Sequence, residues 1–335
     1  MDIRNALLMG RAKLAGKSDY SARDAALLLA HILDCPTEDL YLHPEKPVTP
    51  GEFGAYTALL DRRAQREPIA YIVGYKEFMG FRFKVDGRVL IPRPETEILV
   101  ETALKLAVEM IEGRQEVSPG SLTVCDVCCG SGAIGLSMLK LLSEAVGSKL
   151  TVSQGQFGPG QFAGSRTDLC KPYICKFILT DISPGALEVA KENARQLSID
   201  DGADGDFNAS VLAEFLLGDG LEPLRNRRME GRVDIIVSNP PYIPRDEIVR
   251  LDDEVKSFEP HLALDGGYRG MEFIHKLIAQ AACFLKPGGY LVMEIGHDQA
   301  DQCREAFSAF STLWCKWFSV QDYSGIERVF ASQKA

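Results

Sequence analysis

The sequence predicts an α/β fold, in which a doubly wound parallel sheet follows a small helical bundle. Apolar, strand-like runs alternate with helical patterns from residue 122 to residue 295, and small residues follow the first of these runs. Residues 1–74 instead show helical spacing interrupted by prolines. At 335 residues the chain is long enough for two domains. We therefore expect a helical domain over 1–74, a β-hairpin linker over 75–92 and the sheet domain over 93–335.

The helical region contains two amphipathic patterns, over residues 22–32 and 56–63. In the linker, residues 78–91 alternate apolar and polar side chains around Asp86 and Gly87, which predicts a hairpin turn at this dipeptide.

The first strand of the sheet domain ends at Asp126 and Val127, before a loop of small residues and a new helical pattern. Small residues at such a turn let backbone N–H groups approach a ligand closely. Gly130, Gly132 and Gly135 also fit the dinucleotide pattern Gly-x-Gly-x-x-Gly, so a nicotinamide enzyme has to be considered at this point.

Three more predicted strands end in polar residues: Asp181 after the second, Asp219 and Gly220 after the third, and Asn239-Pro240-Pro241-Tyr242 after the fourth. The carboxyl ends of parallel strands meet at the edge of the sheet where ligands bind. A carboxylate such as Asp181 suits the two hydroxyl donors of a ribose.

The tetrapeptide is the most specific of these signals. The Asn239 side-chain oxygen and the Pro240 carbonyl can both accept hydrogen bonds from one planar NH2 group, and proline offers no competing donor. The following aromatic ring of Tyr242 completes a clamp for a flat amide or amino group. This arrangement has little use in hydride transfer and predicts methylation of an sp2 nitrogen.

Taken together, these motifs resemble those of S-adenosylmethionine-dependent methyltransferases. Residues 67–74 (Glu-Pro-Ile-Ala-Tyr-Ile-Val-Gly) and 90–97 (Leu-Ile-Pro-Arg-Pro-Glu-Thr-Glu), with Glu294 and Gln299 downstream, narrow the resemblance to the HemK-type protein-(glutamine-N5) methyltransferases. The resemblance implies a Rossmann-like sheet, S-adenosyl-L-methionine as cofactor, and methylation of the glutamine in the Gly-Gly-Gln loop of a peptide chain release factor. It also implies that the helical domain recognises that partner.

The resemblance further implies the role of each residue. Asn239 and Pro240 accept from the substrate amide, Tyr242 stacks on its plane, and Pro241 shapes the loop. The cofactor-binding set is Asp126, Cys128, Cys129, Gly130, Ser131 and Gly132 for the methionine part, Asp181 for the ribose, Asp219 and Gly220 for the adenine, and Asn239. Arg93, Glu95 and Glu97 either flank the entrance or form ion pairs between domains, and Glu294 is interpreted as a structural acid at a strand end.

The sequence departs from the family pattern in two respects. Cys128 and Cys129 stand where the family has glycine and a hydroxyl residue, so Cys128 must adopt a backbone conformation typical of glycine. A glycine-rich segment over 147–172 and an acidic one over 200–206 lack apolar periodicity and predict exposed insertions. Runs over 313–320 and 328–331 predict an antiparallel pair that closes the sheet.

The composition limits the alternatives. A net charge of −10 disfavours nucleic acid as a partner, and no apolar run reaches the roughly 18 residues of a membrane span. Of the nine cysteines, Cys125 and Cys128 have Cys-x2-Cys spacing, but no second such pair follows, so we expect reduced thiols and no metal. We also expect residence in the cytoplasm and a monomer. Two alternatives to the glutamine methyltransferase stay open: an N6-adenine methyltransferase on DNA or RNA, and a non-catalytic S-adenosylmethionine-binding protein.

Overall fold

A computed structural model describes residues 1–113, 121–148, 174–199 and 211–335. These residues form two compact units, which we call the helical unit (Met1–Tyr75, Val85–Gly87 and Arg250–Glu259) and the sheet unit (Lys76–Lys84, Arg88–Val249 and Pro260–Ala335). The predicted insertion over 147–172 lies outside the described residues from position 149 onward, and its first two residues end a helix. The acidic segment over 200–206 also lies outside them.

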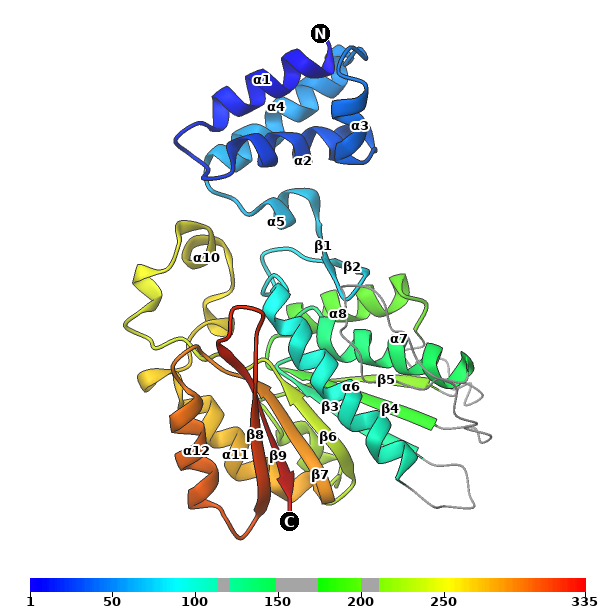
Figure 1. Cartoon of the computed structure of the whole chain (residues 1–335), viewed down its shortest axis with the longest axis vertical. Coiled ribbons are helices and arrows are strands. Elements are labelled where there is room, and N and C mark those ends of the chain that lie inside the picture. The colour runs from blue at the N-terminus through cyan, green and yellow to red at the C-terminus, as the bar shows by residue number, and fades with distance from the viewer. Residues whose placement is uncertain (114–120, 149–173, 200–210) are drawn as a thin grey trace. The chain divides into compact units, whose positions relative to one another are not determined.

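The helical unit contains the two predicted amphipathic helices among its six. Its helices are α1 (Ile3–Leu14), α2 (Ser21–Leu33), α3 (Thr37–Leu42), α4 (Pro50–Ala64), α5 (Ile69–Val73) and α10 (Asp253–Phe258) (Figure 1). The α4 helix begins with a capping box, in which Thr49 and Glu52 satisfy each other's backbone N–H groups. Tyr56 lies fully buried and donates to the Ala25 carbonyl at 3.1 Å. A Cβ at Gly10 would lie 1.9 Å from the Tyr56 hydroxyl, so only glycine lets α1 pass this ring.

A buried arginine joins α10 to the bundle. Arg63 is only 3% exposed; its Nε donates to Asp24 at 2.7 Å, and its Nη2 lies 2.6 Å from the Glu254 carboxylate. Residues 250–259 follow the fourth parallel strand in sequence, yet they belong to the helical unit, where Glu254 pairs with Arg63. The sequence pattern did not predict that arrangement.

The sheet unit contains a seven-stranded sheet in the order β5-β4-β3-β6-β7-β9-β8. The strands are β3 (Ser121–Val127), β4 (Ile174–Asp181), β5 (Val211–Leu217), β6 (Val233–Ser238), β7 (Leu285–Glu294), β8 (Trp314–Gln321) and β9 (Glu327–Lys334). The first five are parallel, and β9 is antiparallel to both β7 and β8. Both the predicted doubly wound sheet and its antiparallel closing pair are confirmed.

Helices cover both faces of this sheet (Figure 1). The helices are η1 (Pro94–Thr96), α6 (Glu97–Glu112), α7 (Ala133–Ser148), α8 (Pro184–Gln196), α9 (Glu222–Asn226), η2 (Ile248–Arg250), η3 (His261–Ala263), η4 (Tyr268–Gly270), α11 (Glu272–Phe284) and α12 (Ala300–Ala309). Because side chains alternate along a strand, Val124 and Ile235 pack with α6 and α7, whereas Cys125 and Ile236 pack with α11 and α12. The parallel strands are therefore apolar on both faces.

The predicted hairpin turn at Asp86 and Gly87 is wrong. The linker does contain a two-stranded sheet of β1 (Tyr75–Phe78) and β2 (Phe81–Lys84), but its turn lies at Met79 and Gly80. Both turn residues have positive φ, at 52° and 79°, as a tight hairpin turn requires. The Glu97 carboxylate accepts from the Met79 N–H at 2.8 Å and so supports a turn in which Met79 precedes the usual glycine.

Two further expectations concern the whole chain. The eight cysteines among the described residues are all free thiols, and four of them are buried. Within the described ranges, no helix combines the length and apolar character needed to cross a bilayer.

Candidate active site

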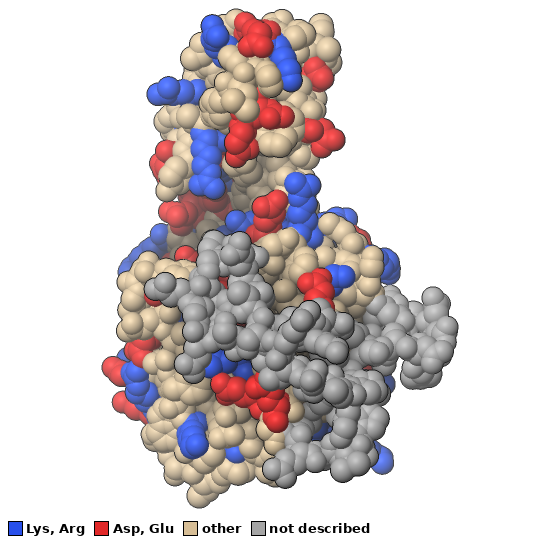
Figure 2. All heavy atoms as spheres, turned by 45° about the vertical axis from the view of Figure 1, so that its right-hand side comes forward, with Lys and Arg blue, Asp and Glu red and all other residues tan. Residues whose placement is uncertain are grey.

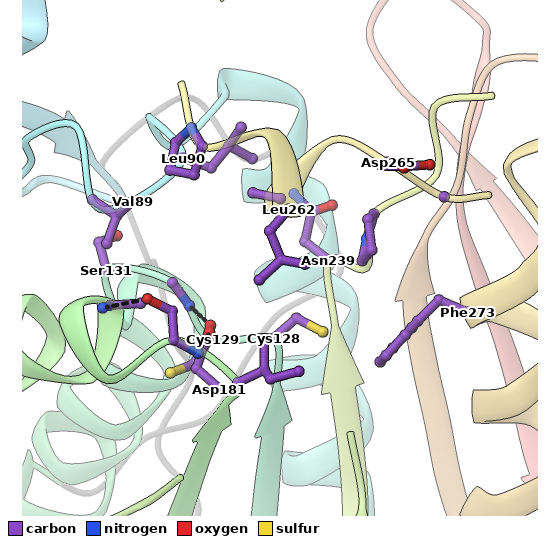
Figure 3. Close-up of a pocket in the computed structure, with 18 of the residues that line it drawn as sticks. Val89, Leu90, Cys128, Cys129, Ser131, Asp181, Asn239, Leu262, Asp265 and Phe273 are labelled. Carbon is purple, nitrogen blue, oxygen red and sulfur yellow. Dashed lines mark hydrogen bonds between the residues drawn. The ribbon is translucent and has the colours of Figure 1, made fainter. Parts of the chain in front are cut away.

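The strand order reverses between β3 and β6, which pair directly with Val127 opposite Ser238. Chain segments leave these two strands toward opposite sides, so a crevice forms at their carboxyl ends. A cavity of about 420 Å³ lies there, within the range of small-molecule sites. Figure 3 shows Cys128, Ser131, Asp181, Asn239 and Phe273 around it.

The loop after β3 turns sharply around the floor of this cavity. Cys128, Gly130 and Gly132 have φ values of 61°, 53° and 78°, so Cys128 does adopt the left-handed conformation expected of it. A Cβ at Gly132 would lie 2.9 Å from a Leu136 methyl group, whereas a Cβ at Gly130 would meet nothing within 4 Å. The open space at Gly130 is what a ligand pressed against the backbone would fill.

Asp126 lies behind this loop and does not line the cavity. Its Oδ2 accepts from the Gly135 N–H at 2.8 Å, near the start of α7, and its Oδ1 is buried without a hydrogen-bond partner in the described part of the chain. Burial, together with the charge of Asp181, raises the pKa of Asp126 to about 7, although the Gly135 bond opposes the shift. The carboxylate holds the loop to the helix and retains one free acceptor.

Asp181 ends β4 and faces the cavity. Its Oδ2 accepts from the Gly130 N–H and its Oδ1 from the Ser183 N–H, both at 2.9 Å. Burial raises its pKa, while these backbone donors favour the charged form. Asp181 therefore keeps its orientation and still has lone pairs for the hydroxyl groups of a ligand.

Asp219 also lines the cavity, after β5, but it carries a partner that the sequence did not predict. Lys276 on α11 forms an ion pair with it and lies 5.7 Å from the centre of the Phe273 ring. Gly220, by contrast, turns its carbonyl to the buried Thr180 hydroxyl at 3.1 Å and does not line the cavity. The aromatic ring and the Asp219 carboxylate form a polar and flat-sided end of the cavity.

Asn239 emerges from β6 with its side chain held by a buried hydroxyl. Its Nδ2 lies 3.3 Å from Thr96 Oγ1 and donates to it, and the Thr96 hydroxyl donates to Glu294 Oε2 at 2.6 Å. Tyr242 donates to the other oxygen of Glu294 at 3.0 Å. Burial raises the pKa of Glu294, against the two hydroxyl donors and the charge of Arg328, and burial beside Glu294 also raises the pKa of Tyr242.

A second set of contacts fixes the backbone after the tetrapeptide. Gln299 Nε2 donates to the Tyr242 carbonyl at 2.9 Å, and Gln299 Oε1 accepts from the Gly296 N–H at 2.8 Å. A Cβ at Gly270 would lie only 2.0 Å from the Tyr242 carbonyl, so the loops approach too closely for any other residue. Ile243 pairs with Asp265 in a β-bridge, which anchors the next step of the chain.

The structure brings together most of the residues predicted from sequence. Cys128, Cys129, Gly130, Ser131, Asp181, Asp219, Asn239 and Pro241 line the cavity. Asp126, Gly132, Gly220, Pro240 and Tyr242 lie outside its lining. Thr96, Gln299 and Lys276 were missed as site residues, although Thr96 and Gln299 stand inside the motifs that carried the resemblance. Glu97 supports the hairpin turn. Glu294 is the expected structural acid at a strand end, and it also accepts hydrogen bonds from both Thr96 and Tyr242.

These residues fit S-adenosylmethionine. The cavity has an open backbone cradle at Gly130, a fixed carboxylate at Asp181 for vicinal hydroxyls, and an aromatic ring at Phe273 for a flat base. The free buried oxygen of Asp126 lies just behind the loop.

Comparisons with known proteins show what this chain is similar to. Residues 5–74 match the model of the PrmC N-terminal domain. The release factor glutamine methyltransferase of Geobacter sulfurreducens is 35% identical, over 98% of this chain and 95% of that protein, and that of Koribacter versatilis is 36% identical, over 92% and 90%. Among solved structures, a methyltransferase from Pyrococcus furiosus aligns with a TM-score of 0.43 and 16% identity, over 83% of this chain and 98% of that one.

Proposed function

The chain belongs to the family of release factor glutamine methyltransferases, and we propose on this basis that it transfers a methyl group from S-adenosylmethionine to the side-chain amide nitrogen (N5) of a glutamine in a peptide chain release factor. We assign the target to the Gly-Gly-Gln loop of that factor. The observation that supports the chemistry best is the amide of Asn239, whose Nδ2 is engaged by Thr96 while the residue lines the cavity.

An amide nitrogen is a poor nucleophile because its lone pair is delocalised into the carbonyl. When bound, S-adenosylmethionine supplies a methyl group made electrophilic by its sulfonium. The protein therefore has to hold the nitrogen in line and stabilise the positive charge that grows on it. Asn239 Oδ1 and the Pro240 carbonyl are acceptors suited to this task, and the Gln299 contact keeps the adjoining backbone in place. Tyr242 would cover the amide plane with its ring while its hydroxyl stays on Glu294.

We assign the cofactor to the other walls of the cavity. The loop from Cys128 to Gly132 would hold the methionine part, with Asp126 fixing the loop from behind through Gly135. Asp181 would accept from the ribose hydroxyls. The adenine would lie near Asp219 and Phe273, where Lys276 already balances the carboxylate charge.

We assign recognition of the release factor to the helical unit, on the basis of its match to the amino-terminal domain of the family. On the face drawn in Figure 2, its basic side chains lie among acidic ones and form no continuous track for a phosphate backbone. Action as a monomer in the cytoplasm belongs to the same proposal, and light scattering of the purified protein would test the monomer.

A transfer assay with methyl-labelled cofactor tests the function. The acceptors are a release factor, the same factor with the glutamine of its Gly-Gly-Gln loop changed to alanine, and adenine-containing DNA and RNA. We expect label only on the unchanged factor, and Asn239→Ala should lower turnover by roughly 10²–10³. Label on nucleic acid would support the adenine alternative, and cofactor binding without transfer to any acceptor would support the non-catalytic one.

A further inference from the structure

The side chain of Asn239 ends in two groups of similar size but opposite hydrogen-bonding character. An oxygen facing the substrate accepts from its NH2 group, whereas an NH2 facing it would set donors against donors. The proposed reaction therefore depends on which way this amide is turned. The backbone contacts of Gln299 and Gly296 fix the loop but do not select either orientation.

The selection comes from a chain of three side chains on three different elements. Glu294, at the end of β7, is 1% exposed, and Thr96, in η1, is 3% exposed. The Thr96 hydroxyl gives its single proton to Glu294 at 2.6 Å, so its oxygen is left only to accept. The nitrogen of the Asn239 amide is the group 3.3 Å away.

Glu294 also orients the hydroxyl group of Tyr242. In its charged form Glu294 has no proton to donate, and both Thr96 and Tyr242 donate their hydroxyl protons to it. Glu294 thus determines which group donates and which accepts in the hydrogen bonds that join β7 to Thr96 and Thr96 to Asn239. A serine at position 96 would preserve this direction, and a valine of the same shape would abolish it.

We propose that Thr96 and Glu294 are positioning residues that turn Asn239 Oδ1 toward the substrate and thereby select an amide over a carboxylate. This inference rests on the proposed function, since it names how the same site recognises its glutamine. A glutamate side chain at neutral pH presents only acceptors, and Asn239 in the observed orientation repels it. With the amide released by Thr96→Val, its NH2 group can turn to the substrate and donate to the glutamate carboxylate instead.

The test compares glutamine and glutamate in the same protein partner. For each variant, the KM for the release factor is compared with the inhibition constant of the factor whose Gly-Gly-Gln glutamine is changed to glutamate. The variants are Thr96→Val, Thr96→Ser and the control Thr123→Val, which makes the same exchange on β3, outside the cavity lining. Cofactor affinity is measured by titration on each.

For Thr96→Val we expect turnover to fall roughly tenfold to a hundredfold. The preference for glutamine over glutamate should shrink by a similar factor, because one buried polar group is then left without its partner. Cofactor affinity should stay within about threefold, because Thr96 contributes to that site only through Asn239. Thr96→Ser and Thr123→Val should keep both the turnover and the preference of the wild type.

The outcomes are distinguishable. If Thr96→Val keeps the wild-type preference for glutamine, the inference is wrong even when its turnover falls, because loss of packing alone lowers rates without changing that ratio. An active wild type with equally active valine and serine variants overturns it as well. A wild type that transfers no methyl group to the release factor overturns the proposed function, and the inference with it.

Discussion

Asp126 should make the stability of this protein depend on pH in an unusual direction. Burial raises the pKa of this carboxyl from 3.8 to about 7 in the folded chain. Between these two values the unfolded chain has lost the proton that the folded chain still holds, so rising pH favours unfolding. The penalty grows from about pH 4 and levels off about one unit above the folded-state pKa.

The magnitude follows from the size of the shift. One pKa unit corresponds to about 1.4 kcal/mol, so the change between about pH 5 and about pH 8 is roughly 3 kcal/mol. Asp181 and Glu294, whose pKa values burial also raises, add to the wild-type profile in the same direction. The comparison with Asp126→Asn isolates one carboxyl, because the other two are present in both proteins.

The assay is urea unfolding followed by circular dichroism, for wild type and Asp126→Asn, at several values between about pH 5 and about pH 8. The asparagine keeps an acceptor for the Gly135 N–H but buries an extra donor, which lowers its stability equally at every pH. We expect the stability difference between the two proteins to move by roughly 3 kcal/mol in favour of the variant as pH rises. A difference that stays constant across this range, or moves in favour of the wild type, would refute the reasoning.

Three further predictions use four substitutions. Gly135→Ala puts a Cβ 2.9 Å from Asp126 Oδ2 and should lower the stability of the fold by about 1–3 kcal/mol. Gly54→Ala in α4, where nothing lies within 4 Å, should raise it by up to about 1 kcal/mol. Thermal unfolding should therefore show changes of opposite sign, and equal changes in the two variants would contradict the packing around Gly135. Asp181→Ala should weaken equilibrium binding of the cofactor before it affects turnover at saturation, and unchanged affinity in a titration would remove Asp181 from the cofactor site. Arg63→Met leaves Asp24 buried without its charge partner and should cost about 3–5 kcal/mol in urea unfolding, so a loss below about 1 kcal/mol would contradict the burial.

Local sequence patterns were sufficient to place a site residue where its position depends on a single strand. The apolar run before Asp181 placed this carboxylate at a strand end. The left-handed conformation of Cys128 was instead implied by the family resemblance, and its φ of 61° confirms it. The position of Asn239 at the end of β6 was predicted in the same way as that of Asp181, because a polar residue after a buried run marks the edge of a parallel sheet.

Contacts between distant segments were beyond such patterns. Thr96 and Glu294 are 198 positions apart, so nothing in either neighbourhood shows that they share a hydrogen bond. The hairpin turn failed for a related reason: Asp86 and Gly87 carry the local signal, but Glu97 stabilises a turn at Met79 instead. Long-range side-chain contacts overrode turn propensity there, as they commonly do at functional sites.

The most direct test of the account is a crystal structure of the chain with the demethylated cofactor and a glutamine peptide. The distance from Asn239 Oδ1 to the peptide side-chain nitrogen should be about 2.7–3.2 Å, with that nitrogen facing the cofactor sulfur. A glutamine held elsewhere in the cavity, or an Asn239 that turns its NH2 group to the peptide, would contradict the central claim that this side chain grips the nitrogen for methyl transfer.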